Sequence, residues 1–84
     1  MLLRLLLVQL PDRPGSLGQV TTLLGRLGVD IHQMRVLDRD GEVATDEFAV
    51  AVPGPVIDRS LPALLEEIPG VRVKSMEPAG ALNP

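Results

Sequence analysis

The chain opens with a nearly continuous run of apolar residues from Leu2 to Leu10, in which Arg4 and Gln9 are the only polar side chains. Such a run is typical of a buried strand. Apolar side chains then recur at every third or fourth position, the period of one helix face, at Leu17, Val20, Leu24 and Leu27. We therefore predict a central strand followed by a helix from about Pro14 to Leu27, with Gly28 as its left-handed cap.

Two glycines, Gly18 and Gly25, lie inside this predicted helix, and each weakens a helix by about 1 kcal/mol relative to alanine. Because glycine has no Cβ, it allows close approach of another backbone. We therefore predict close packing there against the sheet or a second subunit. Pro14 suits the first helical position, where its missing N–H would have no partner.

A hairpin is predicted in the middle of the chain. The second strand runs from Val29 to about Leu37, and either a bulge or a strand that is apolar on both sides would reconcile its irregular apolar spacing. Asp38–Gly41 forms the turn, because Asp-Gly readily supplies the positive φ angles of a tight hairpin. The third strand covers Glu42 to Val52.

The second helix is predicted from Ser60, as its N-cap, to Ile68. Pro62 favours this late start, because proline is compatible only with a first helical turn or a kink. A fourth strand follows over Val71–Met76, where charged and apolar side chains alternate. Residues 78–84 are predicted to be a disordered tail.

The predicted order is β-α-β-β-α-β, which indicates one α+β domain over residues 1–77. It is the ferredoxin-like arrangement, a four-stranded antiparallel sheet with both helices on one face. The first strand is apolar on both faces, with Leu6, Val8 and Leu10 on one and Leu3, Leu5 and Leu7 on the other. Since the helices cover only one face, we predict a homodimer that covers the open face or extends the sheet edge to edge.

Composition narrows the function classes. The net charge of −3 is against a nucleic-acid surface, which needs clustered basic residues, and Phe48 is the sole aromatic for stacking on bases. The absence of cysteine excludes disulfides and thiolate metal sites and fits a cytoplasmic protein. The apolar run at the start is too short to span a bilayer, so no membrane partner is expected.

The segment Pro11-Asp12-Arg13-Pro14-Gly15 links the first strand to the first helix. Behind it lie the N–H groups of Gly15, Ser16 and Leu17, at the positive end of the predicted helix. This is a ready site for a carboxylate or phosphate. In the alternative interpretation, Asp12 only closes the turn by accepting a backbone N–H.

An enzyme is not expected. His32 is the only histidine, and no nucleophile is recognisably paired with it. Asp12 and Asp30 could approach each other, but two acids beside a helix start are more often solvated caps. An acylphosphatase-like site needs an asparagine, and the only one is Asn83 in the tail. We therefore predict no catalytic residues, no cofactor and no metal site.

Three segments together resemble the ACT domain: Val8–Leu17 (VQLPDRPGSL), Leu27–Ile31 (LGVDI) and Ile68–Val71 (IPGV). The resemblance covers residues 2 to 77 in the order expected for that family. ACT domains are regulatory modules, usually fused to enzymes of amino-acid metabolism, that bind amino acids at dimer interfaces. With nothing else attached, this chain resembles a stand-alone member.

The resemblance implies a ligand between the first turn of one subunit and the second strand of its neighbour. The matching residues are Asp12, Arg13, Pro14, Gly15, Ser16 and Leu17, with Asp30, Ile31 and His32 opposite. The chain departs from the family's serine-sensing members, which have asparagine where Asp12 and Asp30 stand and histidine where Leu10 stands. Two acids beside a carboxylate site disfavour serine and leave a basic ligand, a divalent ion or no ligand.

Two functions of different classes follow from the sequence. The first is a sensor that binds an amino acid or similar small molecule at a homodimer interface and modulates a partner. The second is a ligand-free dimerisation or adaptor module that docks on an enzyme or regulator through its apolar sheet face.

Overall fold

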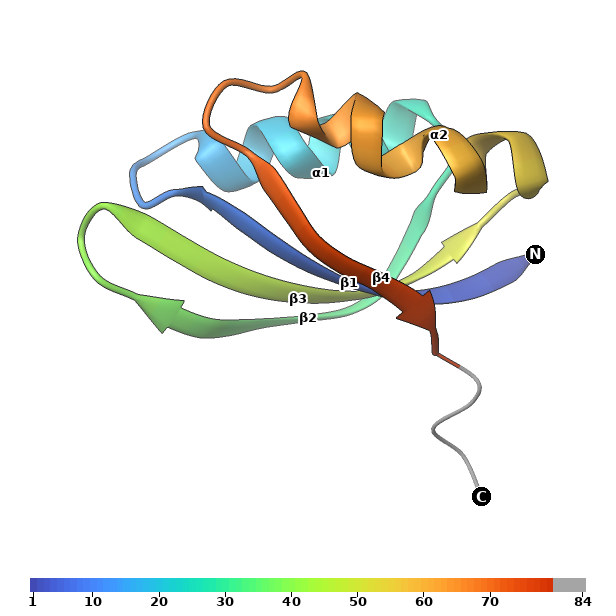
Figure 1. Cartoon of the computed structure of the whole chain (residues 1–84), viewed down its shortest axis with the longest axis horizontal. Helices are drawn as coiled ribbons and strands as arrows, with labels where there is room; N and C mark the ends of the chain where they lie inside the picture. The colour runs from blue at the N-terminus through green and yellow to red at the C-terminus, as the bar shows by residue number, and fades with distance from the viewer. Residues whose placement is uncertain (80–84) are drawn as a thin grey trace.

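The computed structural model describes residues 1–79 and has the predicted order of elements (Figure 1). The elements are β1 (Leu2–Pro11), α1 (Ser16–Arg26), β2 (Asp30–Arg39), β3 (Val43–Val52), α2 (Pro55–Glu66) and β4 (Arg72–Pro78). The four strands form one antiparallel sheet in the order β2-β3-β1-β4. The ferredoxin-like fold expected from the sequence is confirmed.

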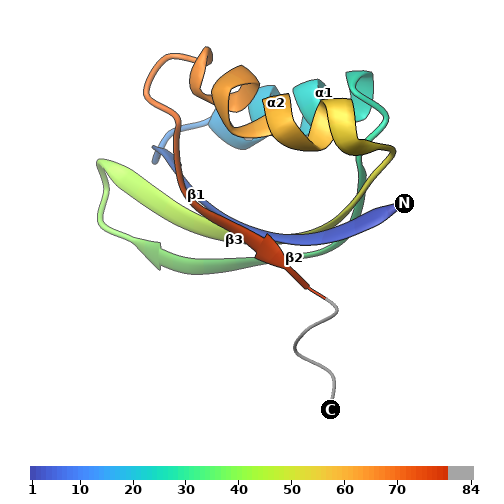
Figure 2. The same ribbon diagram turned by 45° about the vertical axis from the view of Figure 1, so that its right-hand side comes forward.

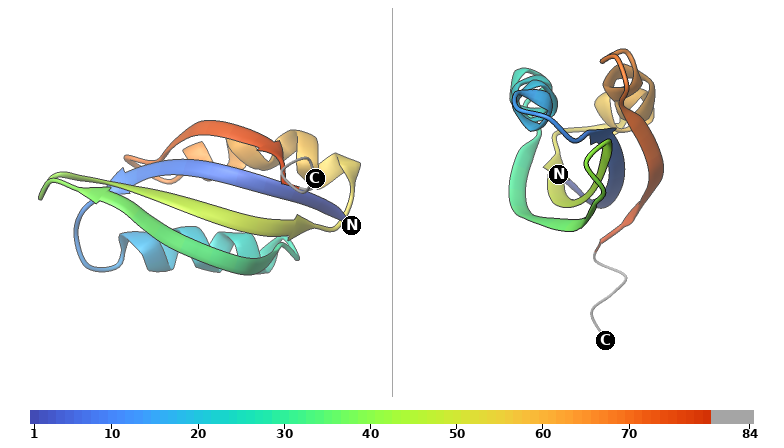
Figure 3. Two further views of the ribbon diagram at one scale, coloured as in Figure 1. Left: turned by 90° about the horizontal axis from the view of Figure 1, so that it is seen from below. Right: turned by 90° about the vertical axis from the view of Figure 1, so that its left-hand side faces the viewer.

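Both helices lie on the same side of the sheet, as Figures 1 and 2 show from two directions. Seen along the strands in Figure 3, the sheet curves beneath the two helices like a trough. The core fills the space between the two layers. It includes the inward-facing Leu6, Val8 and Leu10 of β1, with Phe48 of β3 and Leu61 of α2, all at most 2% exposed.

The pairing of β1 with β3 sets which residues face the helices. It runs without a shift from Leu2 opposite Val52 to Pro11 opposite Val43. The pairing of β2 with β3 shifts register twice, between Ile31 and Gln33 and again between Val36 and Asp38. These irregularities confirm that the predicted second strand is bulged.

Arg4, one of two polar residues in the first apolar run, faces the helix layer and binds α2. Its Nε donates to Asp58 Oδ1 at 2.8 Å, and a second guanidinium nitrogen donates to Asp58 Oδ2 at 3.0 Å. This hydrogen bonding by Arg4 holds the pKa of Asp58 below its ordinary value. The paired contact therefore fixes one end of α2 to the edge of the core.

The first helix starts later than predicted. It begins at Ser16, so Pro14 precedes the helix and Gly15 is its N-cap, with a left-handed φ of 89°. Gly18 and Gly25 are both exposed, and apart from their chain neighbours and the backbone of α1 itself, no described atom lies within 4 Å of a Cβ built at either. The predicted close packing of these glycines on the sheet is therefore wrong, because they lie on the outer surface of the helix.

The second helix starts earlier than predicted, at Pro55 rather than after Ser60, and Pro62 lies in its interior. Pro55 occupies the start of the helix, where proline needs no partner for a missing N–H. The burial of Leu61 and Leu65, both fully inaccessible, holds the helix through Pro62. Local propensity is overridden here by packing on the sheet.

The last strand reaches further than predicted. Pro78 ends β4, and the N–H of Ala79 donates to the Leu3 carbonyl at 3.0 Å. Residues 78 and 79 therefore belong to the sheet and its margin rather than to the predicted tail. The rest of that tail, residues 80–84, lies outside the described residues. Over residues 1–79, neither helix has the length and apolar character needed to cross a membrane.

Gly70, in the turn between α2 and β4, provides a test of this packing. Its φ is +82°, and a Cβ at this position would lie 2.6 Å from Cγ of Pro11. We expect Gly70→Ala to lower the free energy of unfolding by more than the about 1–2 kcal/mol that a left-handed alanine costs. Urea unfolding of the variant measures this loss.

Gly41→Ala is the matched control, because Gly41 has a φ of +90° and, apart from its two chain neighbours, no described atom within 4 Å of its Cβ position. It carries the same backbone strain without the collision. Equal losses in the two variants would show that the contact with Pro11 contributes nothing.

Candidate ligand-binding site

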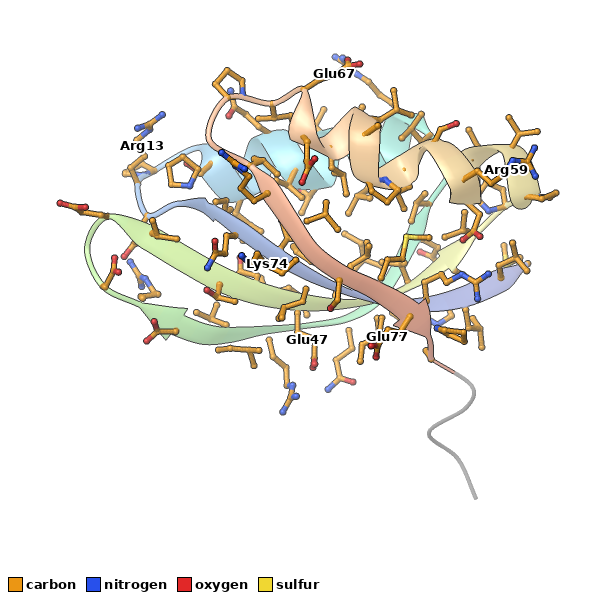
Figure 4. All side chains as sticks on the ribbon, viewed as in Figure 1. Arg13, Glu47, Arg59, Glu67, Lys74 and Glu77 are labelled. Carbon is orange, nitrogen blue, oxygen red and sulfur yellow. The ribbon has the colours of Figure 1, made fainter. Side chains whose placement is uncertain are left out.

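The turn between β1 and α1 is built from backbone hydrogen bonds. The N–H of Arg13 donates to the Pro11 carbonyl at 3.0 Å, and that of Ser16 donates to the Arg13 carbonyl at 3.3 Å. Gly15 then adopts its positive φ, which only glycine tolerates without strain, and the helix begins. Arg13 projects from this turn into solvent (Figure 4).

Asp12 ties this turn to the β2–β3 hairpin. Its Oδ1 accepts a hydrogen bond from Arg39 Nε at 3.0 Å, and its Oδ2 accepts one from the Gly41 N–H at 3.1 Å. The Asp12 side chain is 11% exposed, whereas its partner Arg39 is 67% exposed, so the pair lies at the surface with Asp12 on its inner side. Its own N–H donates to the Glu42 carbonyl at 2.9 Å. Asp12 therefore has a structural role, but it joins the turn to the hairpin and does not cap α1 as the alternative interpretation expected.

The start of α1 offers donors rather than acceptors. Among residues 1–79, no side chain caps this helix end, and its first turn contains no acid. The N–H of Gln19 donates to the Gly15 carbonyl at 3.0 Å, which is the first α-helical hydrogen bond from the N-cap. The Ser16 N–H is engaged within the turn, which leaves the amides of Leu17 and Gly18 at the helix end, where the helix dipole is positive.

A cleft of about 380 Å³ lies against this helix end. Its lining includes the whole predicted turn, Asp12 to Leu17, so six of the nine predicted site residues meet here. The remaining lining is Leu10, Pro11, Val36, Arg39, Ala44 and Asp46. The site therefore combines helix amides, two arginines, two carboxylates and an apolar floor.

Asp46 is the residue that the sequence analysis missed. It lies on β3 in the inward row, is 3% exposed, and lines the cleft. Its Oδ1 is buried and has no hydrogen-bond partner in the part of the chain that the structure describes. Burial raises the pKa of Asp46, the Arg39 charge opposes the shift, and the Asp12 charge adds to it. The signal was present, since Asp46 interrupts a buried row that runs from Ala44 to Val52.

The other three predicted site residues lie elsewhere. Asp30 pairs with Ala51, which pairs with Leu3, so it lies at the start of β1 rather than at its end. The eight-residue separation from Leu3 to Pro11 corresponds to about 27 Å along an antiparallel strand. The predicted approach of Asp12 and Asp30 within one chain is therefore wrong. Ile31 and His32 share this distant position, where His32 Nε2 lies 3.3 Å from Asp30 Oδ2 on an exposed edge.

The described residues bring together no group of three or more histidine, cysteine or acidic side chains that could hold a metal ion. A larger hollow, of about 640 Å³, lies between α1 and α2. Its lining is mainly glycine, aliphatic and neutral polar residues, with Arg26 and Glu67 at its margin. Gly15 and Gly18 at the start of α1 also line it, but none of its lining residues is a buried acid or has a buried polar atom without a partner, so the smaller cleft is the better candidate.

A family model, described as the ACT domain, matches residues 4–70. The chain belongs to the ACT domain family. This membership identifies it as a small regulatory module, and the β1–α1 turn with its cleft lies within the matched region.

Solved structures show the same fold at low sequence identity. An ACT domain protein from Streptococcus pneumoniae aligns with a TM-score of 0.71 and 16% identity, over 99% of this chain and 96% of that one. An unknown protein from Galdieria sulphuraria aligns with a TM-score of 0.75 and 18% identity, over 99% of this chain. This chain spans about half of the Galdieria protein, 48% of its length. A search of curated proteins finds no match.

The raised pKa of Asp46 makes stability depend on pH in a defined direction. A carboxyl group whose pKa is higher in the folded state favours folding at low pH, and this contribution is lost as the pH rises through the folded-state pKa. We therefore expect Asp46→Asn to be more stable than the wild type at pH 7. The difference should shrink as the pH falls below the ordinary range of an aspartate.

Urea unfolding of both proteins between pH 3 and pH 7 measures this difference. Asp38→Asn is the control, because Asp38 is exposed on β2 and outside the cleft. A stability difference for Asp46→Asn that stays constant with pH would contradict the titration.

Proposed function

We propose that this ACT domain is a non-catalytic regulatory module of the cytoplasm that binds an amino acid or similar small molecule in the cleft at the start of α1. The observation that carries the proposal is an acid-free helix start, uncapped by the side chains of residues 1–79, opening on a cleft of about 380 Å³. A carboxylate bound there accepts hydrogen bonds from the helix amides and gains from the helix dipole. Membership of a regulatory family supports the same function.

We further propose that the ligand lies at a homodimer interface and alters contact with a partner protein. Asp30, Ile31 and His32 lie at the far end of β2 in their own chain. They can serve the same ligand only if a second subunit contributes them. In support of a dimer, the sheet carries an apolar stripe on the face opposite the helices, formed by Leu3, Leu5, Leu7 and Ala49.

The second candidate is a ligand-free adaptor that docks on an enzyme or regulator through this stripe. Leu3 is 45% exposed, and Leu5 and Leu7 are partly exposed beside it. Charged side chains surround the stripe: Arg35 pairs with Glu47, and Glu47 and Glu77 extend from the same side of the sheet (Figure 4). An apolar strip with a charged rim is typical of a protein interface.

A thermal-melt screen of the twenty common amino acids tests the first function. A dye must report unfolding, because the chain has no tryptophan or tyrosine. A ligand at a hundredfold its Kd stabilises the folded state by about 2.7 kcal/mol. In a domain of this size that raises Tm by about 10 °C or more.

Two alanine-to-leucine variants make the screen specific to the cleft. Ala44→Leu adds three carbon atoms to the floor of the cleft and should abolish the shift, whereas Ala63→Leu adds them on the exposed side of α2 and should preserve it. Gly15→Val is a poorer test, because the φ of +89° would strain any valine there. A flat screen across all twenty amino acids would favour the adaptor.

Sedimentation equilibrium tests the homodimer. We expect a dimer at micromolar concentration. We expect Leu5→Asp to raise the dissociation constant of the dimer at least tenfold, because a charge would be buried in the apolar stripe. Val56→Asp is the control, since Val56 is 64% exposed at the start of α2. A wild-type monomer throughout would overturn the dimer.

A further inference from the structure

The buried carboxylate of Asp46 defines what kind of ligand the cleft takes, and this inference rests on the proposed function above. A buried carboxylate normally has hydrogen-bonded partners, because burying a charged group without them is costly. Within residues 1–79, Asp46 Oδ1 has none. The cationic side chain of Arg39 acts on it through its charge but directs its Nε to Asp12 instead.

The two ends of the cleft therefore offer opposite hydrogen-bonding groups to a ligand. The start of α1 presents N–H donors at the positive end of the helix dipole. Asp46, on β3, presents an acceptor at the buried side of the same cleft. Asp12 and Arg39 largely satisfy each other, with their closest atoms 3.0 Å apart. What remains is an unmatched donor end and an unmatched acceptor.

The rest of the cleft is apolar. Leu10 and Ala44 form a cross-strand pair on the inward face, and Val36 and Leu17 complete the lining beside them. Val36 is 52% exposed and lies directly opposite Asp46 on the neighbouring strand. A ligand that covers Val36 would remove apolar surface from water while its polar end reaches Asp46.

We propose that the cleft binds an aliphatic amino acid as a zwitterion, with its ammonium on Asp46, its carboxylate at the start of α1 and its side chain on Leu10, Val36 and Ala44. A simple carboxylic acid would bring a second negative charge next to Asp46 and leave that residue without a donor. A zwitterion supplies both partners at once, and charge-assisted hydrogen bonds of this kind are the strong ones. The site thus selects for the amino group.

Calorimetric titration of the full chain tests this inference by comparing leucine with two analogues. The first, 4-methylpentanoate, lacks the amino group, and the second, 3-methylbutylamine, lacks the carboxylate. We expect leucine to bind at least tenfold more tightly than either analogue. We expect Asp46→Asn to weaken leucine at least tenfold and to leave 4-methylpentanoate unchanged or bound more tightly. Asp38→Asn, which replaces an exposed acid outside the cleft, should bind leucine as the wild type does.

The outcomes separate this inference from the proposed function. Equal binding of leucine and 4-methylpentanoate, or leucine binding that is unaffected by Asp46→Asn, would overturn the role of Asp46 while leaving a small-molecule sensor intact. Tighter binding of serine, lysine or glutamate than of leucine would overturn the aliphatic class. Absence of binding by every amino acid in the thermal screen would overturn the proposed function itself.

Discussion

The unbroken pairing of β1 with β3 is the constraint on which the rest of this structure depends. Ten consecutive residue pairs, from Leu2–Val52 to Pro11–Val43, determine which side chains face the helices. They place Asp46 opposite Val8 and Ala44 opposite Leu10, under the start of α1. A slip of one residue would turn every side chain of β3 to the other face. The cleft would then lose its acid, and Glu47 would enter the core. The register that builds the hydrophobic core is thus the same one that builds the site.

That register also explains why an acid is tolerated in the core layer. Asp46 lies toward the hairpin end of β3, three residues after the strand begins at Val43, and it lines the cleft at the start of α1. Arg39, on the neighbouring strand, opposes the effect of burial on its pKa without hydrogen-bonding to it. The charge of Arg39 therefore offsets part of the cost of burying the Asp46 carboxylate, and its Oδ1 can still accept a hydrogen bond. A carboxylate fully paired within the chain would be a structural element and could recognise nothing.

The fold could be predicted from the sequence because local patterns and overall topology agree. The apolar run of β1, the three-to-four spacing of α1 and the Asp-Gly turn each indicate one element, and their order indicates one sheet. The start of α2 could not be predicted in this way. Proline disfavours the interior of a helix, and only the burial of Leu61 and Leu65 on the sheet overrides this preference at Pro62. The distance between Asp12 and Asp30 follows from topology: a helix between parallel strands returns the chain to the end where it began. Asp46 escaped notice because its burial depends on pairing over long range, which residue type alone does not reveal.

The two hydrogen bonds of Asp12 have a mechanical consequence. They join the turn before α1 to Arg39 and Gly41, which lie at the far end of edge strand β2 and in the hairpin beyond it. Any displacement of the turn must stretch these bonds or carry the hairpin along. At the cleft end of the molecule, side-chain hydrogen bonds therefore join the turn to the hairpin, while the opposite end of β2 is held by its backbone pairing with β3. The start of α1 is in this way linked directly to an exposed sheet edge, whose outer backbone groups are open to pairing with another strand.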